Sequence, residues 1–224
     1  MDIIDDYLSE SIFIGELSLD GNIRRVKGIL PILISAKDIG IKRVFIPYEN
    51  SYEAVFVEGI QIIPVKNLKE CIDYLNDLIV INDLETKNID IENIEYEDDF
   101  SDIQGNLFVK RGVEIACAGN HNILMIGPPG SGKTMIARII SILPKINKDE
   151  IIEISKIYSS IGLFDDIGLF NKRPFRNPHH TTTKQSIIGG GKEAKPGEIV
   201  LSHRGVLFLD EIAEFDKKTL ECLR

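Results

Sequence analysis

The sequence predicts an α/β fold with parallel strands, and three observations lead to this prediction. Residues 12–80 alternate strand-like and helix-like stretches. A glycine-rich stretch at 127–134 lies between an apolar run and a helical run, and a second apolar run at 206–209 ends in two acidic residues. Short apolar runs of this kind are typical of strands buried in parallel sheets. We therefore expect parallel strands whose ends carry the functional groups.

The N-terminal part, residues 1–80, is predicted to form a mixed α/β module. Residues 12–19 favour a strand, and the pair Asp20-Gly21 is a turn signal that returns the chain as a hairpin through residues 22–26. The further elements expected are a helix at 29–38 with Gly40 after its end, a strand at 44–47, a helix at 49–57, a strand at 61–65 and an amphipathic helix at 68–78. The module contains no recognisable metal-ligand cluster or nucleophile.

An acidic stretch separates this module from the rest of the chain. Residues 83–102 contain nine acidic residues against the single Lys87. Such a stretch is typical of a solvated linker. We therefore predict a module at 1–80, an acidic linker at 81–99 and a second domain at 100–224.

The second domain contains a complete match to the phosphate-binding loop pattern G-x-x-x-x-G-K-[ST]. The matching residues are Gly127, Pro128, Pro129, Gly130, Ser131, Gly132, Lys133 and Thr134. The apolar run at 122–126 is expected to be a buried parallel strand, and residues 133–140 are expected to continue as a helix. Strand, glycine loop and helix together aim backbone N–H groups at a triphosphate, so a chance match is disfavoured.

Each residue type of this loop suits ATP and Mg²⁺. The glycines allow the backbone to approach the phosphates. Lys133 is expected to reach the β- and γ-phosphates, and Thr134 is expected to ligate Mg²⁺. The sequence therefore predicts ATP and Mg²⁺ as cofactors.

Residues 206–211, Val-Leu-Phe-Leu-Asp-Glu, supply the second half of the predicted site. They suggest a buried strand whose C-terminal end carries two carboxylates, where ligands of open α/β sheets bind. Asp210 is expected to hold Mg²⁺, and Glu211 is the candidate general base that polarises the attacking water. Alone, an Asp-Glu pair is more often a solvated strand end, but together with the phosphate loop it predicts hydrolysis of ATP.

Composition narrows the class of protein. A length of 224 residues and an apolar fraction of 43% suit one or two globular domains. The sequence shows no membrane-spanning run and no signal-peptide pattern, and Cys71, Cys117 and Cys222 are scattered, so reduced thiols and a cytoplasmic location are expected. The net charge of −9 argues against a surface that attracts nucleic acid as a whole.

Part of the N-terminal module resembles a known family. Residues 15–21, 26–28 and 40–50 are similar to the C-terminal half of the proteolytic domain of Lon proteases. That domain uses a Ser-Lys dyad, and the resemblance implies that the serine would lie upstream of Met1. The dyad lysine would fall near residue 30, where this chain has Leu30, and Lys27 is expected on a different face. The resemblance therefore implies a peptidase-like fold without peptidase activity.

The whole chain resembles the magnesium-chelatase-like AAA+ ATPases of the ComM/YifB type. The R-P-F-R-N-P-H-H block at 173–180 is the most specific motif. The other motifs are 99–105, 110–111, 114–116, 119–122, the phosphate loop (Walker A), 189–191, 196–198 and 205–211 (Walker B). The fold class implied is a Lon-protease-like α/β module followed by a partial P-loop (AAA+) parallel-sheet ATPase domain. The resemblance also implies that residues 101–105 border the adenine, that subunits assemble as a hexameric ring, and that ATP hydrolysis drives DNA branch migration in competence.

The segment between the two ATP motifs contains a candidate DNA contact. Residues 172–195 include Lys172, Arg173, Arg176, Lys184, Lys192 and Lys195 against Glu193. This basic, glycine-tipped loop is either a contact for DNA phosphates or a solvated surface hairpin. For the adjacent His179 and His180, a structural or hydrogen-bonding role is favoured over metal binding, because neighbouring side chains of a strand point to opposite sides and no Cys or acid stands at ligand spacing.

By comparison with the sheet order 5-1-4-3-2 of this ATPase class, the sequence lacks strand 4, the sensor residues and the arginine finger. We therefore expect a chain truncated at both ends that binds ATP weakly and hydrolyses little by itself. Three hypotheses follow: an ATP-driven DNA-remodelling motor, an ATPase subunit of a magnesium-chelatase-type complex, and an inactive regulatory fragment. No membrane partner is expected.

Overall fold

The computed structural model describes residues 7–89, 99–138, 143–164, 169–170, 172–191 and 194–223. The chain divides into two compact units. Unit 1 comprises Met1–Asp90 and Ser155–Phe170, and unit 2 comprises Ile91–Ile154 and Asn171–Arg224. The predicted division at 1–80, 81–99 and 100–224 stays a prediction, and residues 90–98 of the acidic stretch lie outside the described residues.

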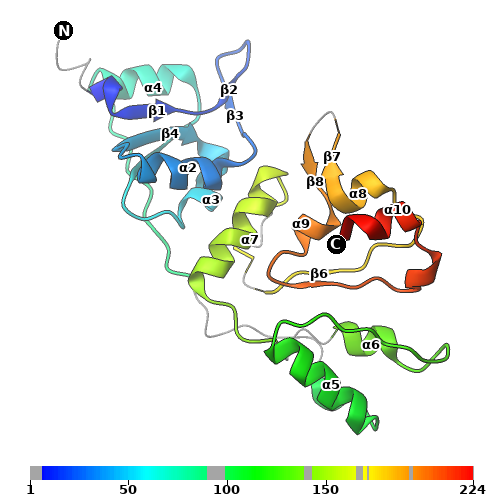
Figure 1. The fold of residues 1–224 in the computed structure, drawn as a ribbon. Helices are drawn as coiled ribbons and strands as arrows, with labels where there is room; N and C mark the ends of the chain where they lie inside the picture. Colours follow the sequence, from blue (N-terminus) through cyan, green and yellow to red (C-terminus); the bar gives the residue numbers. More distant parts are fainter. Residues whose placement is uncertain are drawn as a thin grey trace. The chain divides into compact units, whose positions relative to one another are not determined.

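Unit 1 is built on a parallel sheet in the order β1-β4-β5 (Figure 1). The strands are β1 (Ser11–Phe13), β4 (Arg43–Pro47) and β5 (Gln61–Val65), and β4 and β5 pair along their full length from Arg43↔Gln61 to Pro47↔Val65. β-branched and aromatic residues dominate the central strand, which suits a strand covered on both faces. The sequence prediction of a parallel α/β fold is confirmed in this unit.

Two helices cover opposite sides of this sheet (Figure 1). Helix α2 (Ile29–Asp38) buries Ile29, Leu30, Leu33 and Ala36. Helix α4 (Leu68–Leu75) packs Cys71 against Phe45, Ile63 and Val65. Asn67 caps α4 by accepting the N–H of Glu70 at 2.8 Å. These two layers form the core of unit 1.

The predicted hairpin forms, although it is shorter than expected. The predicted strand at 12–19 splits into β1 and β2 (Glu16–Leu17), and β2 pairs antiparallel with β3 (Ile23–Arg24). Gly21 has φ +83° in the turn, a conformation that favours glycine. The predicted helix at 49–57 is a 3₁₀ turn, η1 (Tyr48–Asn50), followed by the short helix α3 (Ser51–Ala54).

Residues 81–89 form no helix or strand, yet their backbone is held against unit 1. The N–H of Leu84 donates to the carbonyl of Ile62 at 3.0 Å, and the N–H of Lys87 donates to the carbonyl of Val55 at 2.7 Å. The Asp83 carboxylate accepts from the side-chain amide of Gln61 at 2.9 Å. This part of the acidic stretch is therefore attached to the module rather than free in solvent.

The described part of unit 2 contains two small sheets. Strands β6 (Phe175–Arg176) and β9 (Val206–Leu207) pair in parallel, and β7 (Gly189–Gly190) and β8 (Lys195–Pro196) form an antiparallel hairpin. A Cβ on Gly205 would lie 2.0 Å from the Pro174 carbonyl oxygen, so only glycine allows β9 to approach β6 here.

The described part of unit 2 also contains helices and 3₁₀ turns. They are η2 (Phe100–Asp102), α5 (Leu107–Ala118), α6 (Lys133–Arg138), α7 (Lys148–Ser160), α8 (Lys184–Ile188), α9 (Glu198–Leu201), η4 (Ile212–Glu214), α10 (Lys217–Leu220) and η5 (Glu221–Leu223). Residues up to Ile154 of α7 belong to unit 2, and the following residues of the helix belong to unit 1. Residues 139–142, which include the end of the helix predicted at 133–140, lie outside the described residues.

The strand predicted at residues 122–126 is not formed, so this prediction is wrong. Residues 121–128 have no regular secondary structure, and Ile123, Leu124 and Ile126 expose 48%, 70% and 90% of their surface. A strand is stabilised by hydrogen bonds and side-chain contacts with a neighbouring strand, and in the described parts of the chain no strand pairs with this segment. The strand predicted at 206–209 forms over Val206–Leu207 only.

Candidate ATP site

The phosphate loop, residues 127–134, has the backbone conformation that its glycines predict. Gly130 has φ +75° and Gly132 has φ +81°, values that side chains other than glycine rarely adopt. The N–H of Ser131 donates to the carbonyl of Pro128 at 3.3 Å, which closes the turn. Helix α6 begins at Lys133, directly after the last glycine.

Lys133 folds back over its own loop. Its Nζ lies 3.0 Å from the carbonyl oxygens of both Gly127 and Pro128, and 3.5 Å from Oγ of Ser131. The ammonium group therefore sits on the loop that precedes α6, which is where a lysine must lie to meet a phosphate cradled by that loop.

The two predicted Mg²⁺ ligands meet. Oγ1 of Thr134 donates to Oδ2 of Asp210 at 3.2 Å, across 76 positions of sequence. Asp210 follows β9, and its Oδ1 accepts the N–H of Glu211 at 3.0 Å. A threonine hydroxyl and a carboxylate supply the oxygen ligands that Mg²⁺ prefers.

Glu211, the candidate general base, adopts a left-handed backbone conformation with φ +51°. A non-glycine residue in this region is uncommon and is often found at functional sites. Its side chain is 69% exposed, and Oε2 lies 3.8 Å from Nδ1 of His180.

The adjacent histidines His179 and His180 do not lie in a strand, so the expected alternation of their side chains does not apply. They follow β6, and their rings lie side by side with centroids 4.0 Å apart. Nδ1 of His179 contacts Oγ1 of Thr181 at 2.9 Å and accepts the N–H of Thr181 at 3.3 Å. The described residues form no cluster of three or more His, Cys, Asp or Glu side chains suited to a metal.

The segment expected to border the adenine packs against the helix of the phosphate loop. Ile103 is buried with Val113 of α5 and Ile136 of α6. Asp99 caps the preceding turn η2 by accepting the N–H of Ser101 at 2.7 Å. Residues 100–105 and the phosphate loop are thus connected through one small apolar cluster.

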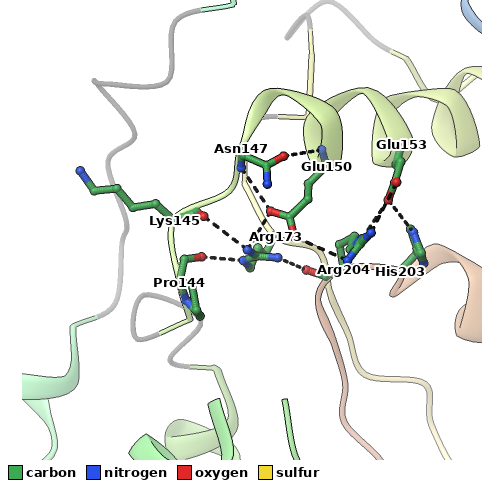
Figure 2. A network of polar contacts seen from close by, with 8 residues as sticks. All are labelled: Pro144, Lys145, Asn147, Glu150, Glu153, Arg173, His203 and Arg204. Atoms are coloured by element: carbon green, nitrogen blue, oxygen red, sulfur yellow. Dashed lines mark hydrogen bonds and ion pairs between the residues drawn. The ribbon is translucent and has the colours of Figure 1, made fainter. Parts of the chain in front are cut away.

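A polar network fixes the start of β6 (Figure 2). The guanidinium of Arg173, only 10% exposed, donates to the Glu150 carboxylate at 3.0 Å and to the carbonyl oxygens of Pro144 and Arg204 at 2.8 Å each. Asn147 and Glu150 form a reciprocal cap at the start of α7, with hydrogen bonds of 2.9 and 3.2 Å. This network joins the segments that precede β6 and β9 to the start of α7.

Glu153, one turn further along α7, completes the network (Figure 2). Its carboxylate accepts from Arg204 at 2.8 Å and lies 3.2 Å from Nε2 of His203. Hydrogen bonds from Arg204 and then from His203 lower the pKa of Glu153 to about 2.

The residues present fit ATP and Mg²⁺. The loop supplies glycine backbone at positive φ, Lys133 supplies a cation beside it, and Thr134 and Asp210 supply two adjacent oxygen ligands. Bound Mg²⁺ would neutralise phosphate charge during hydrolysis. Glu211, which follows Asp210 in the sequence, has an exposed carboxylate able to accept a proton from water.

The family described as magnesium chelatase, subunit ChlI, matches residues 99–224, and a second ChlI family description matches residues 3–50. The chain belongs to the magnesium chelatase ChlI family. The phosphate loop and the Asp210-Glu211 pair lie within the first of these matches, and the parallel α/β fold of the chain suits this family.

Similar proteins cover nearly all of this ChlI family chain. An uncharacterized protein of Mycobacterium tuberculosis is 38% identical over 221 residues, which is 97% of this chain and 43% of that protein. The uncharacterized protein YifB of Escherichia coli is 37% identical over 97% of the chain and 42% of its own length, and the competence protein ComM of Haemophilus influenzae is 35% identical over 97% and 43%. The chain thus spans less than half the length of these relatives.

The resemblance to Lon proteases is also confirmed, over a shorter stretch. Lon protease 2 of Bacillus subtilis is 39% identical over 80 residues, which is 35% of this chain and 14% of that protein. Leu30, which stands where the resemblance would place a lysine, is 1% exposed at the start of α2. In the described part of the chain, no helix is long and apolar enough to cross a membrane.

Proposed function

We propose that this chain binds ATP with Mg²⁺ and supplies the nucleotide site of a motor that couples ATP hydrolysis to DNA remodelling. The contact between Thr134 and Asp210 carries the first half of this proposal. It joins the phosphate loop to the end of β9 at 3.2 Å, although 76 positions separate the two residues. In this proposal Lys133 binds the phosphates, Thr134 and Asp210 hold Mg²⁺, and Glu211 is the catalytic base.

DNA as the partner is supported by the name of one relative and by part of the basic loop at residues 172–195. ComM of Haemophilus influenzae is named a competence protein. Arg173 and Arg176, however, are engaged inside unit 2, since Arg173 pairs with Glu150 and Arg176 pairs with Glu198 at 2.6 Å. The exposed Lys172 and Lys184 are therefore better candidates for phosphate contacts than either arginine.

The charge argument can be tested directly. We expect the double variant Lys172→Ala/Lys184→Ala to bind duplex DNA more weakly than the wild type. The slope of log affinity against log salt concentration should fall in magnitude by about one for each lysine that contacts a phosphate. The matched control is Lys217→Ala/Lys218→Ala, which removes two lysines from the exposed face of α10. Equal DNA affinity and equal salt dependence in all three proteins would reject the loop as a DNA contact.

A second candidate function is an ATPase subunit of a magnesium-chelatase-type complex. The family description favours it, whereas the match to a Lon protease over 80 residues favours the ComM/YifB type. A cytoplasmic location and a homo-oligomeric, hexameric ring are further parts of the proposal. An inactive regulatory role is the third hypothesis, and it predicts no nucleotide binding.

The deciding experiment measures ATP hydrolysis alone, with branched DNA, and with magnesium-chelatase partner subunits. Glu211→Gln and Lys133→Ala serve as controls for site-dependent hydrolysis. Stimulation by DNA supports the motor, and stimulation by chelatase subunits alone supports the second candidate. Hydrolysis that is unchanged in both variants would contradict the proposed site.

A further inference from the structure

The side chain of His180 lies close to the candidate base Glu211, and His180 is not among the residues proposed to bind ATP or Mg²⁺. Nδ1 of His180 lies 3.8 Å from Oε2 of Glu211, and the exposed fractions of the two side chains are 30% and 69%. A carboxylate so exposed can adopt several rotamers, whereas a general base must lie within hydrogen-bond reach of the proton that it removes. A neighbour that favours one rotamer would therefore assist the reaction.

The pairing of β6 with β9 explains why these two residues meet. Arg176 pairs with Leu207 in the parallel register. His180 follows Arg176 by four positions (180 − 176), and Glu211 follows Leu207 by four positions (211 − 207). Because parallel strands run side by side and end at the same edge, equal offsets bring both residues to that edge.

The imidazole ring of His180 has two aromatic neighbours. The ring of His179 lies 4.0 Å away, and the ring of Phe215 lies 6.5 Å away in an edge-on arrangement. Phe215 is 5% exposed, and His179 is itself fixed by the hydrogen bonds to Thr181. The ring that faces Glu211 is thus restricted before any ligand binds, which is what a positioning residue requires.

We propose that His180 is a positioning residue for Glu211, holding its carboxylate in one orientation beside Thr134 and Asp210. This inference rests on the proposed ATPase function. His180 acts through Glu211 and neither binds the nucleotide nor takes up the proton from water. His179, which bonds Thr181, has no such role.

The contact itself is tested without nucleotide. In a ¹H–¹³C correlation spectrum of the full chain at fixed pH, we expect the Hε1–Cε1 signal of His180 to move in Glu211→Gln and to stay in place in Glu153→Gln. The signal of His203 should show the reverse, since His203 lies 3.2 Å from Glu153. A His180 signal that is identical in the wild type and in Glu211→Gln would overturn the proposal.

The functional role is tested by single-turnover hydrolysis with the chain in excess over labelled ATP. His180→Ala should slow hydrolysis at least about fivefold with nucleotide affinity unchanged within twofold, because a displaced catalytic group loses rate rather than binding. His180→Gln, which keeps a hydrogen-bond donor, should restore part of the rate. His179→Ala should slow hydrolysis less than His180→Ala, because it removes only a ring that packs against His180.

The outcomes separate this inference from the function on which it rests. If Glu211→Gln abolishes hydrolysis while His180→Ala does not slow it, the positioning role is wrong and the ATPase function stands. If neither Glu211→Gln nor Lys133→Ala changes hydrolysis, or the wild type hydrolyses no ATP, the proposed function fails and the role of His180 fails with it.

Discussion

The hydroxyl of Ser159 donates a 2.6 Å hydrogen bond to the carboxylate of Glu53, across 106 positions of sequence, and both side chains are fully buried. The second carboxylate oxygen accepts from the hydroxyl of Tyr52 at 3.0 Å and lies 3.7 Å from the Arg25 guanidinium. A buried carboxylate is costly unless such partners surround it. This cluster therefore fastens the segment Ser155–Phe170 to the N-terminal part of unit 1.

Ser159→Ala should destabilise unit 1 by about 1–3 kcal/mol, because it leaves the buried Glu53 carboxylate short of one donor. The measurement is urea unfolding followed by tyrosine fluorescence, to which the neighbouring Tyr52 contributes. Ser160→Ala is the matched control, since Ser160 is exposed and its hydroxyl only bonds the carbonyl of Ile157. Equal stability of the two variants would contradict the role of the Ser159–Glu53 bond.

Arg173→Ala should destabilise unit 2 by about 2–4 kcal/mol, because it removes a nearly buried cation from Glu150 and from two backbone carbonyls. Lys172→Ala, at the exposed neighbouring position, should change stability by no more than about 0.5 kcal/mol. Thermal unfolding of both variants checks this. If Arg173→Ala is as stable as the wild type and instead loses DNA affinity, the arginine is a DNA contact after all.

The pairing of Glu153 predicts a pH dependence of stability at acid pH. Its pKa is lowered to about 2 in the folded protein, against an ordinary value of 4.5. A depressed carboxyl pKa contributes stability that is present above the unfolded value and is lost as pH falls toward the folded value. The wild type should therefore lose stability between about pH 5 and pH 2, and Glu153→Gln should lose less over the same range.

The control for this effect is Asp149→Asn, which removes one carboxylate from an exposed position of the same helix. The difference in urea midpoint between pH 7 and pH 3 is compared among the three proteins. A difference that is as large in Glu153→Gln as in Asp149→Asn would show that the Glu153 network makes no contribution.

The contact between Thr134 and Asp210 predicts which substitution of Thr134 preserves the dependence of nucleotide affinity on Mg²⁺. Thr134→Ser retains the oxygen that lies near Asp210, whereas Thr134→Val has nearly the same shape without it. Nucleotide affinity should rise with added Mg²⁺ in the wild type and in Thr134→Ser, and should be insensitive to Mg²⁺ in Thr134→Val. The titration is run with and without EDTA, and a full Mg²⁺ response in Thr134→Val would refute the assignment.

Local sequence patterns were sufficient to predict much of the fold and the residues of the candidate ATP site. The apolar strands at 43–47 and 61–65, the Asp20-Gly21 turn and the glycines of the phosphate loop are determined by neighbouring residues, and all form. The pairing of Thr134 with Asp210 was expected from the roles of the two motifs. These features depend on periodicity or on backbone conformations that few residues adopt.

What could not be predicted depends on contacts between distant segments. Residues 123–126 have the composition of a buried strand, but a strand forms only where a neighbour pairs with it. The meeting of His180 with Glu211 depends on the register of β6 with β9, which the sequence does not reveal. Ser159 likewise carries no local sign that it bonds Glu53.

The central claim is that residues 127–134 form an ATP site, and the most direct test is the binding of a fluorescent ATP analogue with Mg²⁺ to the wild-type chain and to Lys133→Ala. Lys217→Ala, on the exposed face of α10, is the charge-matched control. We predict saturable binding that Lys133→Ala weakens at least about tenfold and that Lys217→Ala leaves unchanged, because Lys133 supplies the cation beside the loop. Absence of saturable binding in the wild type, or equal binding in the wild type and Lys133→Ala, would contradict the claim.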